Sequence, residues 1–162
     1  MGNTPEDTGP KSVVELRESL LEGIVDQAGI GAASQARALL DYVQATIPPE
    51  QAEDMAVVQD QLVSRSVPFI QRTGDRSERH LRLLGVSHLL VSLIRPAVVR
   101  TEDEYITSRF EDLSDRLMSL EKVEEANPQV DHRLTAIYQG LVELASALGL
   151  SSCDALCFQE RS

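Results

Sequence analysis

Aromatic and basic residues are scarce in this chain of 162 residues. It has no tryptophan, three phenylalanines and three tyrosines, and its 15 Lys and Arg stand against 26 Asp and Glu, for a formal net charge of −11. Nucleic-acid phosphates are bound by Lys and Arg, and aromatic rings commonly stack on bases or grip flat cofactors. We therefore expect no nucleic-acid partner and no cofactor, and we interpret the acidic balance chiefly as a source of solubility.

Cysteine and histidine are also rare. Cys153 and Cys157 lie four residues apart, but zinc and iron–sulfur sites usually need four Cys or His ligands, and the sequence has no second pair. The three histidines, His80, His88 and His132, form neither an HExxH motif nor a nucleophile–base–acid series. We therefore expect free thiols, no metal site and no enzymatic activity.

The N-terminus is polar and has no apolar leader. Residues 1–11 contain Pro5, Gly9 and Pro10 among polar residues, so we expect a disordered lead-in followed by a single helical domain over 12–158. Two thiols without an export signal indicate a reducing compartment. The predicted location is therefore cytoplasmic.

Apolar residues recur at helical spacing through most of the chain, and no segment alternates with a period of two. This pattern predicts an all-α, single-domain bundle of about six helices. Whether residues 67–70 extend the third helix past Pro68 or form a separate turn stays open. The expected helices cover residues 12–28, 34–45, 49–64, about 76–95, 102–125 and 128–148.

The helix over about 76–95 contains the most apolar passage of the sequence. Its apolar residues cover well over half of the helical circumference, so we expect it to be the central, buried helix. Pro96 should stop or kink it. Because the passage is shorter than the roughly 20 residues that span a bilayer and contains His88 and Arg95, we expect no membrane partner.

Residues 102–149 should form a C-terminal antiparallel helical hairpin. The first helix has a narrow apolar stripe with alternating spacings of four and three, opposite an acidic face, which is typical of an outer helix. The second helix continues this rhythm, so the two stripes should pack at a shallow angle, with Leu113 or Leu117 against Ile137 or Leu141. The first stripe consists of Ile106, Phe110, Leu113, Leu117 and Leu120.

Four arginines, Arg72, Arg76, Arg79 and Arg82, surround the start of the predicted central helix. The helix dipole disfavours cations there, so this cluster needs an anionic counterpart. One candidate is internal, namely the acidic residues of the 102–125 helix or of the N-terminal helices. The other is an acidic partner or a phosphate-bearing ligand, which arginine forks bind well.

A polar strip runs along the same helix. Gly85, His88, Ser92 and Arg95 follow one another at helical spacing. The strip either forms a polar contact between helices or faces solvent, or it receives a small ligand or a side chain of a partner.

One passage of the central helix resembles the globins. Arg79-His80 followed by Leu84-Gly85-Val86 is similar to the region where the haem-ligating histidine precedes a Gly-Val or Gly-Ile pair. Leu84-Gly85-Val86-Ser87 is also similar to a passage of globin-like sensor domains that bind no haem. The resemblance implies a ligand-sensing helical domain with a pocket beside the helix at 76–95.

Two functional interpretations follow from these patterns. The first is a non-catalytic helical interaction module, such as an adaptor, regulatory or assembly factor, that binds another protein or a second copy of this chain. The alternative is the ligand-sensing domain of globin-like type.

Overall fold

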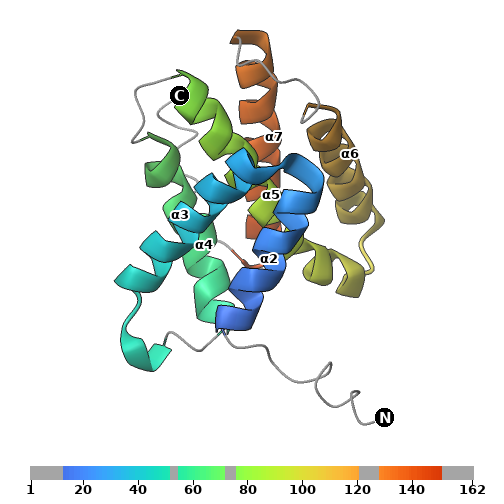
Figure 1. The fold of residues 1–162 in the computed structure, drawn as a ribbon. Coiled ribbons are helices and arrows are strands. Elements are labelled where there is room, and N and C mark those ends of the chain that lie inside the picture. Colours follow the sequence, from blue (N-terminus) through green and yellow to red (C-terminus); the bar gives the residue numbers. More distant parts are fainter. Residues whose placement is uncertain (1–12, 52–54, 72–75, 121–127, 151–162) are drawn as a thin grey trace, which may run out of the picture.

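A computed structural model describes residues 13–51, 55–71, 76–120 and 128–150 of the chain. Within these ranges there are six α-helices, one short 3-10 helix and no strand, which confirms the all-α bundle (Figure 1). The predicted lead-in at 1–11 lies outside the described residues. The α-helices are α2 (Val13–Ala28), α3 (Ile30–Thr46), α4 (Met55–Gln71), α5 (Arg76–Arg100), α6 (Glu104–Leu120) and α7 (Pro128–Ala147).

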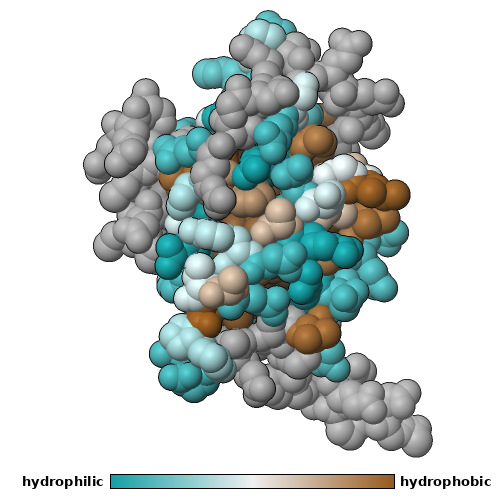
Figure 2. All heavy atoms as spheres, turned by 60° about the vertical axis from the view of Figure 1, so that its left-hand side comes forward, coloured by the Kyte–Doolittle hydropathy of each residue, from teal (hydrophilic) through white to brown (hydrophobic). Residues whose placement is uncertain are grey.

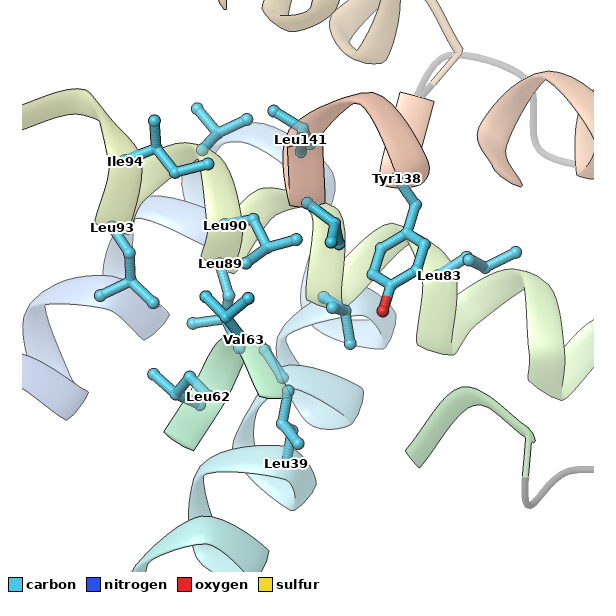
Figure 3. Close-up of a cluster of buried hydrophobic side chains, with 14 of the residues drawn as sticks. Leu39, Leu62, Val63, Leu83, Leu89, Leu90, Leu93, Ile94, Tyr138 and Leu141 are labelled. Atoms are coloured by element: carbon cyan, nitrogen blue, oxygen red, sulfur yellow. The ribbon is translucent and has the colours of Figure 1, made fainter. Parts of the chain in front are cut away.

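Helix α5 is the centre of the bundle, as predicted. It packs against each of the other five α-helices, and every side chain from Leu83 to Val91 is buried. Figure 3 shows α5 side chains meeting Leu39 of α3, Leu62 of α4 and Leu141 of α7 in one apolar cluster. A helix that is apolar on most of its surface needs neighbours on several sides, and α5 has them.

The predicted end of the central helix at residue 95 is wrong. Helix α5 continues through Pro96 to Arg100, and the amide of Thr101 still donates to the carbonyl of Ala97 at 3.0 Å. Pro96 lies on an exposed side of the helix, where water can bond to the carbonyl that the proline ring leaves unpaired. Burial of Val98, which is 5% exposed, favours continuation of the helix.

This extension also changes the argument about membranes. Ser77–Arg100 is long and apolar enough to cross a bilayer by length and composition, contrary to the expectation from the shorter range. However, 67% of its apolar window is buried inside the structure. A buried core helix meets the same criteria, so the absence of a membrane partner stays a prediction.

Helices α2 and α3 form a tight helical hairpin in front of α5 (Figure 1). Gly29 alone makes the turn with a φ of 97°, and its amide donates to the carbonyl of Ile24 at 3.1 Å. Glycine adopts this left-handed conformation without a steric penalty. Helix α3 therefore starts at Ile30, four residues before the predicted position.

Helix α4 differs at both ends from the helix expected over residues 49–64. Residues Pro49–Gln51 form a 3-10 helix, and α4 is described from Met55. Its C-terminal part runs through Pro68 to Gln71, which resolves the open question about residues 67–70. Phe69 and Ile70 are 3% and 1% exposed, and their burial offsets the hydrogen bond lost at Pro68.

The C-terminal hairpin is present as two antiparallel helices. Leu113 packs against Gly140, whereas Leu120, at the end of α6, lines one groove with His132, near the start of α7. Leu113 also shares that groove with Ile137. Helix α6 starts at Glu104 and not at residue 102, because the Asp103 carboxylate caps it by accepting the amide of Tyr105 at 2.9 Å.

The outer surface is mainly polar where it is described. In Figure 2 hydrophilic residues predominate on one face, and hydrophobic ones form separate patches between them. Large apolar side chains that are more than 70% exposed are Ile30, Val99 and Tyr105.

Candidate functional site

Two of the four predicted arginines bind within the protein. Arg79 Nη1 lies 2.8 Å from Asp131 Oδ2 of α7 and donates to Thr135 Oγ1 at 3.4 Å. Asp131 belongs to the hairpin's second helix, so the expected partners in the 102–125 helix or the N-terminal helices were wrong for this arginine. The pairing ties the start of α5 to the start of α7.

Arg82 makes three contacts with neighbouring residues. Its Nη1 donates to the carbonyl of Phe69 at 2.7 Å, its Nη2 lies 3.1 Å from Glu78 Oε2, and its guanidinium lies 4.5 Å from the centroid of the Phe69 ring. Arg72 and the side chain of Arg76 lie outside the described residues. The described arginines of this cluster are therefore engaged in joining helices.

The predicted polar strip does not form one surface. A Cβ on Gly85 would lie 2.5 Å from the carbonyl oxygen of Ala32, so this position is pressed onto the backbone of α3. His88 is 3% exposed and Ser92 is half-buried, whereas Arg95 is exposed, with its guanidinium 5.2 Å from the Phe110 ring centroid. Close approach of helices at Gly85 agrees with the interhelical interpretation of the strip.

The two buried histidines of α5 stay neutral near pH 7. Burial lowers the pKa of His88 to about 4, and His88 Nε2 has no hydrogen-bond partner among the described residues. Burial also lowers the pKa of His80, opposed by the nearby Asp131 carboxylate. His80 is the position that the globin resemblance marks, and it is 6% exposed, at the Arg79–Asp131 junction between α5 and α7.

A groove between α6 and α7 brings together the arginines of the described part of the hairpin. It has a volume of about 420 Å³. Three arginines and one histidine line it, together with Ser119 and an apolar floor of Leu113, Leu120, Ala136 and Ile137. The basic residues are Arg109 and Arg116 from α6, and His132 and Arg133 from α7.

Described acidic side chains offset only part of this charge. Asp112 lies 3.1 Å from Arg116 Nε and 3.8 Å from Arg109 Nη1, so one carboxylate serves two guanidinium groups. Both pairs are partly exposed, with Arg116 at 65% and Asp112 at 46% side-chain exposure. Exposed pairs of this kind contribute under about 1 kcal/mol and exchange readily with other partners. The groove is therefore locally basic within a strongly acidic chain.

Sequence reasoning missed this site because its residues are brought together by the hairpin. Arg109 and Arg116 are seven residues apart, so two helical turns place them on the same side of α6. His132 and Arg133 reach them only because α7 runs back along α6. The signal in the sequence was the pair of arginines between the apolar stripe and the acidic face of the first hairpin helix.

The described residues form no metal site in addition to the groove. Among the described residues, no group of three or more His, Cys, Asp or Glu side chains is arranged to hold a metal ion. Cys153 and Cys157 lie outside those residues, so the prediction of free thiols is not tested. Comparisons of the chain with known protein families, curated proteins and solved structures gave no match, so its function must be inferred from the groove itself.

Proposed function

We propose that this protein is a non-catalytic interaction module that binds an acidic, amphipathic segment of another protein along the α6–α7 groove. The observation that carries the proposal is the convergence of Arg109, Arg116, His132 and Arg133 on one apolar-floored groove. In a chain with a net charge of −11, three arginines gathered at one groove favour a negatively charged partner locally.

The shape and lining of the groove favour a peptide segment. Leu113, Leu120 and Ile137 line the groove with 2%, 8% and 3% of their surface exposed, so they add a small apolar floor beside the arginines. An amphipathic helix docks in this way, with its apolar face in the groove and its charged flanks against the rim. Arginine forks then bind Asp and Glu carboxylates with two parallel hydrogen bonds.

Contacts inside the fold hold α7 in place. Arg79–Asp131 and the Ser66–Tyr138 hydrogen bond of 2.6 Å fix α7 against α5 and α4. Because α7 is anchored on its inner side, its outer side and α6 can present a preformed groove. Binding to a preformed surface avoids the cost of ordering it first.

A peptide-binding measurement tests the proposal. The probe is a labelled helical peptide with Leu at positions i, i+3, i+4 and i+7 and Glu on both flanks. The comparison peptide carries Lys in place of Glu. The field of the whole chain attracts the Lys peptide, so preferential binding of the Glu peptide, weakened by salt, would have to come from the groove.

Charge reversal locates the binding site. R133E should weaken binding of the Glu peptide by roughly tenfold or more, because it removes one rim contact and adds a repulsion. R37E makes the same change of charge on the exposed face of α3 and should leave the affinity nearly unchanged. Equal losses in both variants, or preference for the Lys peptide or a single-stranded oligonucleotide, would contradict the proposal.

The ligand-sensing alternative has a direct test of its own. An absorbance spectrum of the purified protein would show a Soret band if haem were bound. The described structure places His80 among buried contacts and Gly85 against α3, and it offers no observation that favours this alternative over the groove.

A further inference from the structure

Ser119 is an exposed residue in the last turn of α6, and it lines the α6–α7 groove. Among the described residues no carboxylate lines this groove, whose basic residues are Arg109, Arg116, His132 and Arg133. Guanidinium groups bind phosphoryl oxygens with paired, charge-assisted hydrogen bonds. A phosphate on the Ser119 hydroxyl would therefore lie among side chains that bind phosphate well.

The sequence also distinguishes Ser119 from every other hydroxyl residue. Arg116 precedes it by three residues, and nowhere else in the chain does a serine or threonine follow an arginine at that spacing. Helical residues three apart have Cβ atoms about 5–6 Å apart, so the two side chains are neighbours. Protein kinases select substrates partly by the charges around the acceptor residue. The same arginine can therefore direct a kinase to Ser119 and bind the phosphate afterwards.

The arginines of the groove are available to a new anion because their present ion pairs are weak. The Asp112 carboxylate lies 3.1 Å from Arg116 Nε and 3.8 Å from Arg109 Nη1, and the Arg116 side chain is 65% exposed. Arg133 forms no ion pair within the described part of the chain. A phosphoserine has a charge of about −1.5 to −2 at pH 7 and three acceptor oxygens, so it can bind two guanidinium groups at once.

Two features of α6 oppose a negative charge at Ser119. The helix dipole disfavours anions near the C-terminal end, and the exposed Asp115 lies four residues before Ser119. Arg116 on the same helix and Arg133 on α7 must offset both effects. Their removal should therefore have a measurable consequence for the phosphate.

Ser108 provides a matched contrast on the same helix. It is also exposed, but it does not line the groove. The acidic residues three or four positions away from it are Glu104, Glu111 and Asp112. A phosphate on Ser108 would meet like charges there, so the two serines separate the effect of the groove from that of an added negative charge.

We propose that Ser119 is a phosphorylation site and that its phosphate, bound by Arg116 and Arg133, closes the α6–α7 groove to acidic segments. A protein kinase transfers the γ-phosphoryl group of ATP. A bond forms between Ser119 Oγ and the γ-phosphorus while the bond from that phosphorus to the β–γ bridging oxygen breaks, ADP leaves, and the hydroxyl proton passes to a carboxylate of the kinase. The closure rests on the proposed function, whereas binding of the phosphate by the arginines does not.

Kinase treatment of the full chain tests the modification. A serine kinase that selects arginine three residues before its acceptor should add phosphate from ATP, and peptide mapping by mass spectrometry should locate it on Ser119. S119A should remove this phosphate, and S108A should leave it in place. Phosphate on other residues only, or none on the folded chain, would overturn the assignment of Ser119.

A ³¹P NMR titration tests binding of the phosphate without any peptide. Phosphoserine is inserted during translation at position 119 or at position 108. The pKa of the phosphate at 119 should lie below its usual value of about 6, because guanidinium groups favour the dianion, and R133Q should raise it again. Equal pKa values at the two positions would overturn the inference. Thermal unfolding checks that each protein is folded.

Affinity for the Glu peptide tests the closure. Phosphate on Ser119 should weaken binding by roughly tenfold or more, whereas phosphate on Ser108 should change it by less than about threefold. Equal weakening by both would reveal a general effect of charge and refute the closure. If the unmodified chain does not bind the Glu peptide, the proposed function fails, and the ³¹P titration still decides whether the groove binds the phosphate.

Discussion

Helices α5 and α6 follow one another in the chain but occupy opposite environments. Every side chain from Leu83 to Val91 of α5 is buried, and the polar residues His80, Ser87 and His88 of this helix are also 6%, 0% and 3% exposed. Helix α6 buries a single stripe, formed by Phe110, Leu113, Leu117 and Leu120. The difference arises because α5 packs against each of the other five α-helices, whereas the main contacts of α6 among the described residues are with α5 and α7.

This contrast divides the molecule into a part that determines stability and a part that is available for binding. A substitution on α5 affects tightly packed neighbours and should therefore lower the free energy of unfolding. A substitution on the outer face of the α6–α7 hairpin lies in solvent and should mainly alter binding to other molecules. Three experiments, two of which compare residues from the two regions, test this division.

The largest effect is expected at the two buried glycines. A Cβ on Gly85 would meet the carbonyl oxygen of Ala32 at 2.5 Å, and this backbone cannot move without shifting α3. The atoms nearest to a Cβ on Gly140 would be the ends of the Leu113 and Arg109 side chains, at 3.0 and 3.2 Å. G85A should therefore lower the free energy of unfolding by about 2–3 kcal/mol.

In the same chemical denaturation experiment, G140A should cost less than about 1 kcal/mol because side-chain ends can turn aside. G23A serves as a positive control, since nothing lies within 4 Å of a Cβ there and Gly23 is inside α2. It should stabilise the protein by roughly 0.5–1 kcal/mol. If G85A and G140A lowered the free energy of unfolding equally, the α5–α3 contact would be no tighter than the α7–α6 contact.

The next effect is a pH dependence that originates in α5. Burial lowers the pKa of His88 to about 4, from 6.5 in the unfolded chain. Below pH 6.5 His88 is protonated in the unfolded state but stays neutral in the native state. The free energy of unfolding therefore decreases as the pH falls from 6.5 toward 4. Between about pH 7 and pH 5 the loss should be about 2 kcal/mol.

The substitution H88L should remove this part of the pH profile, measured by denaturation at each pH. The lowered pKa of His80 acts in the same direction and remains in the variant. The difference between the two profiles therefore isolates His88. A constant difference between them from pH 7 to pH 5 would show that His88 is not buried as a neutral group.

The smallest effects concern arginines. Arg79 and Asp131 have side-chain exposures of 29% and 17%, and Arg79 also donates to Thr135. R79Q breaks this link between α5 and α7 and should cost about 1 kcal/mol. R116Q removes an exposed pair within α6 and should cost less than about 0.5 kcal/mol. Thermal unfolding of both variants measures the order, and a larger cost at Arg116 would contradict the assignment of α6 as the outer helix.

Much of this architecture could be predicted from periodicity alone. The wide apolar arc of residues 76–95 predicted a central helix, and the narrow stripe from Ile106 to Leu120 predicted an outer one. Helix ends were less predictable. Local rules predicted a stop or kink at Pro96 and left the end at Pro68 open, whereas burial of Val98 and of Phe69 with Ile70 favours the continuation of both helices past their prolines.

The candidate sites show where sequence reasoning stops. It found the basic cluster at the start of α5 but expected Arg79 to pair with the 102–125 helix or the N-terminal helices, because Asp131 is 52 residues from Arg79 and becomes a neighbour only through packing. It missed the basic groove for the same reason. Arg116 and Arg133 belong to different helices, and nothing in the spacing along either helix joins them.

The sequence by itself therefore determined the helical class, the central position of residues 83–94 and the pairing of the last two helices, because hydrophobic burial depends on periodicity along the chain. Only the tertiary structure decided which charges meet. Electrostatic contacts form between side chains a few ångströms apart in space, and that proximity is set by how the helices pack. The proposal of a binding groove between α6 and α7 rests on this second kind of information.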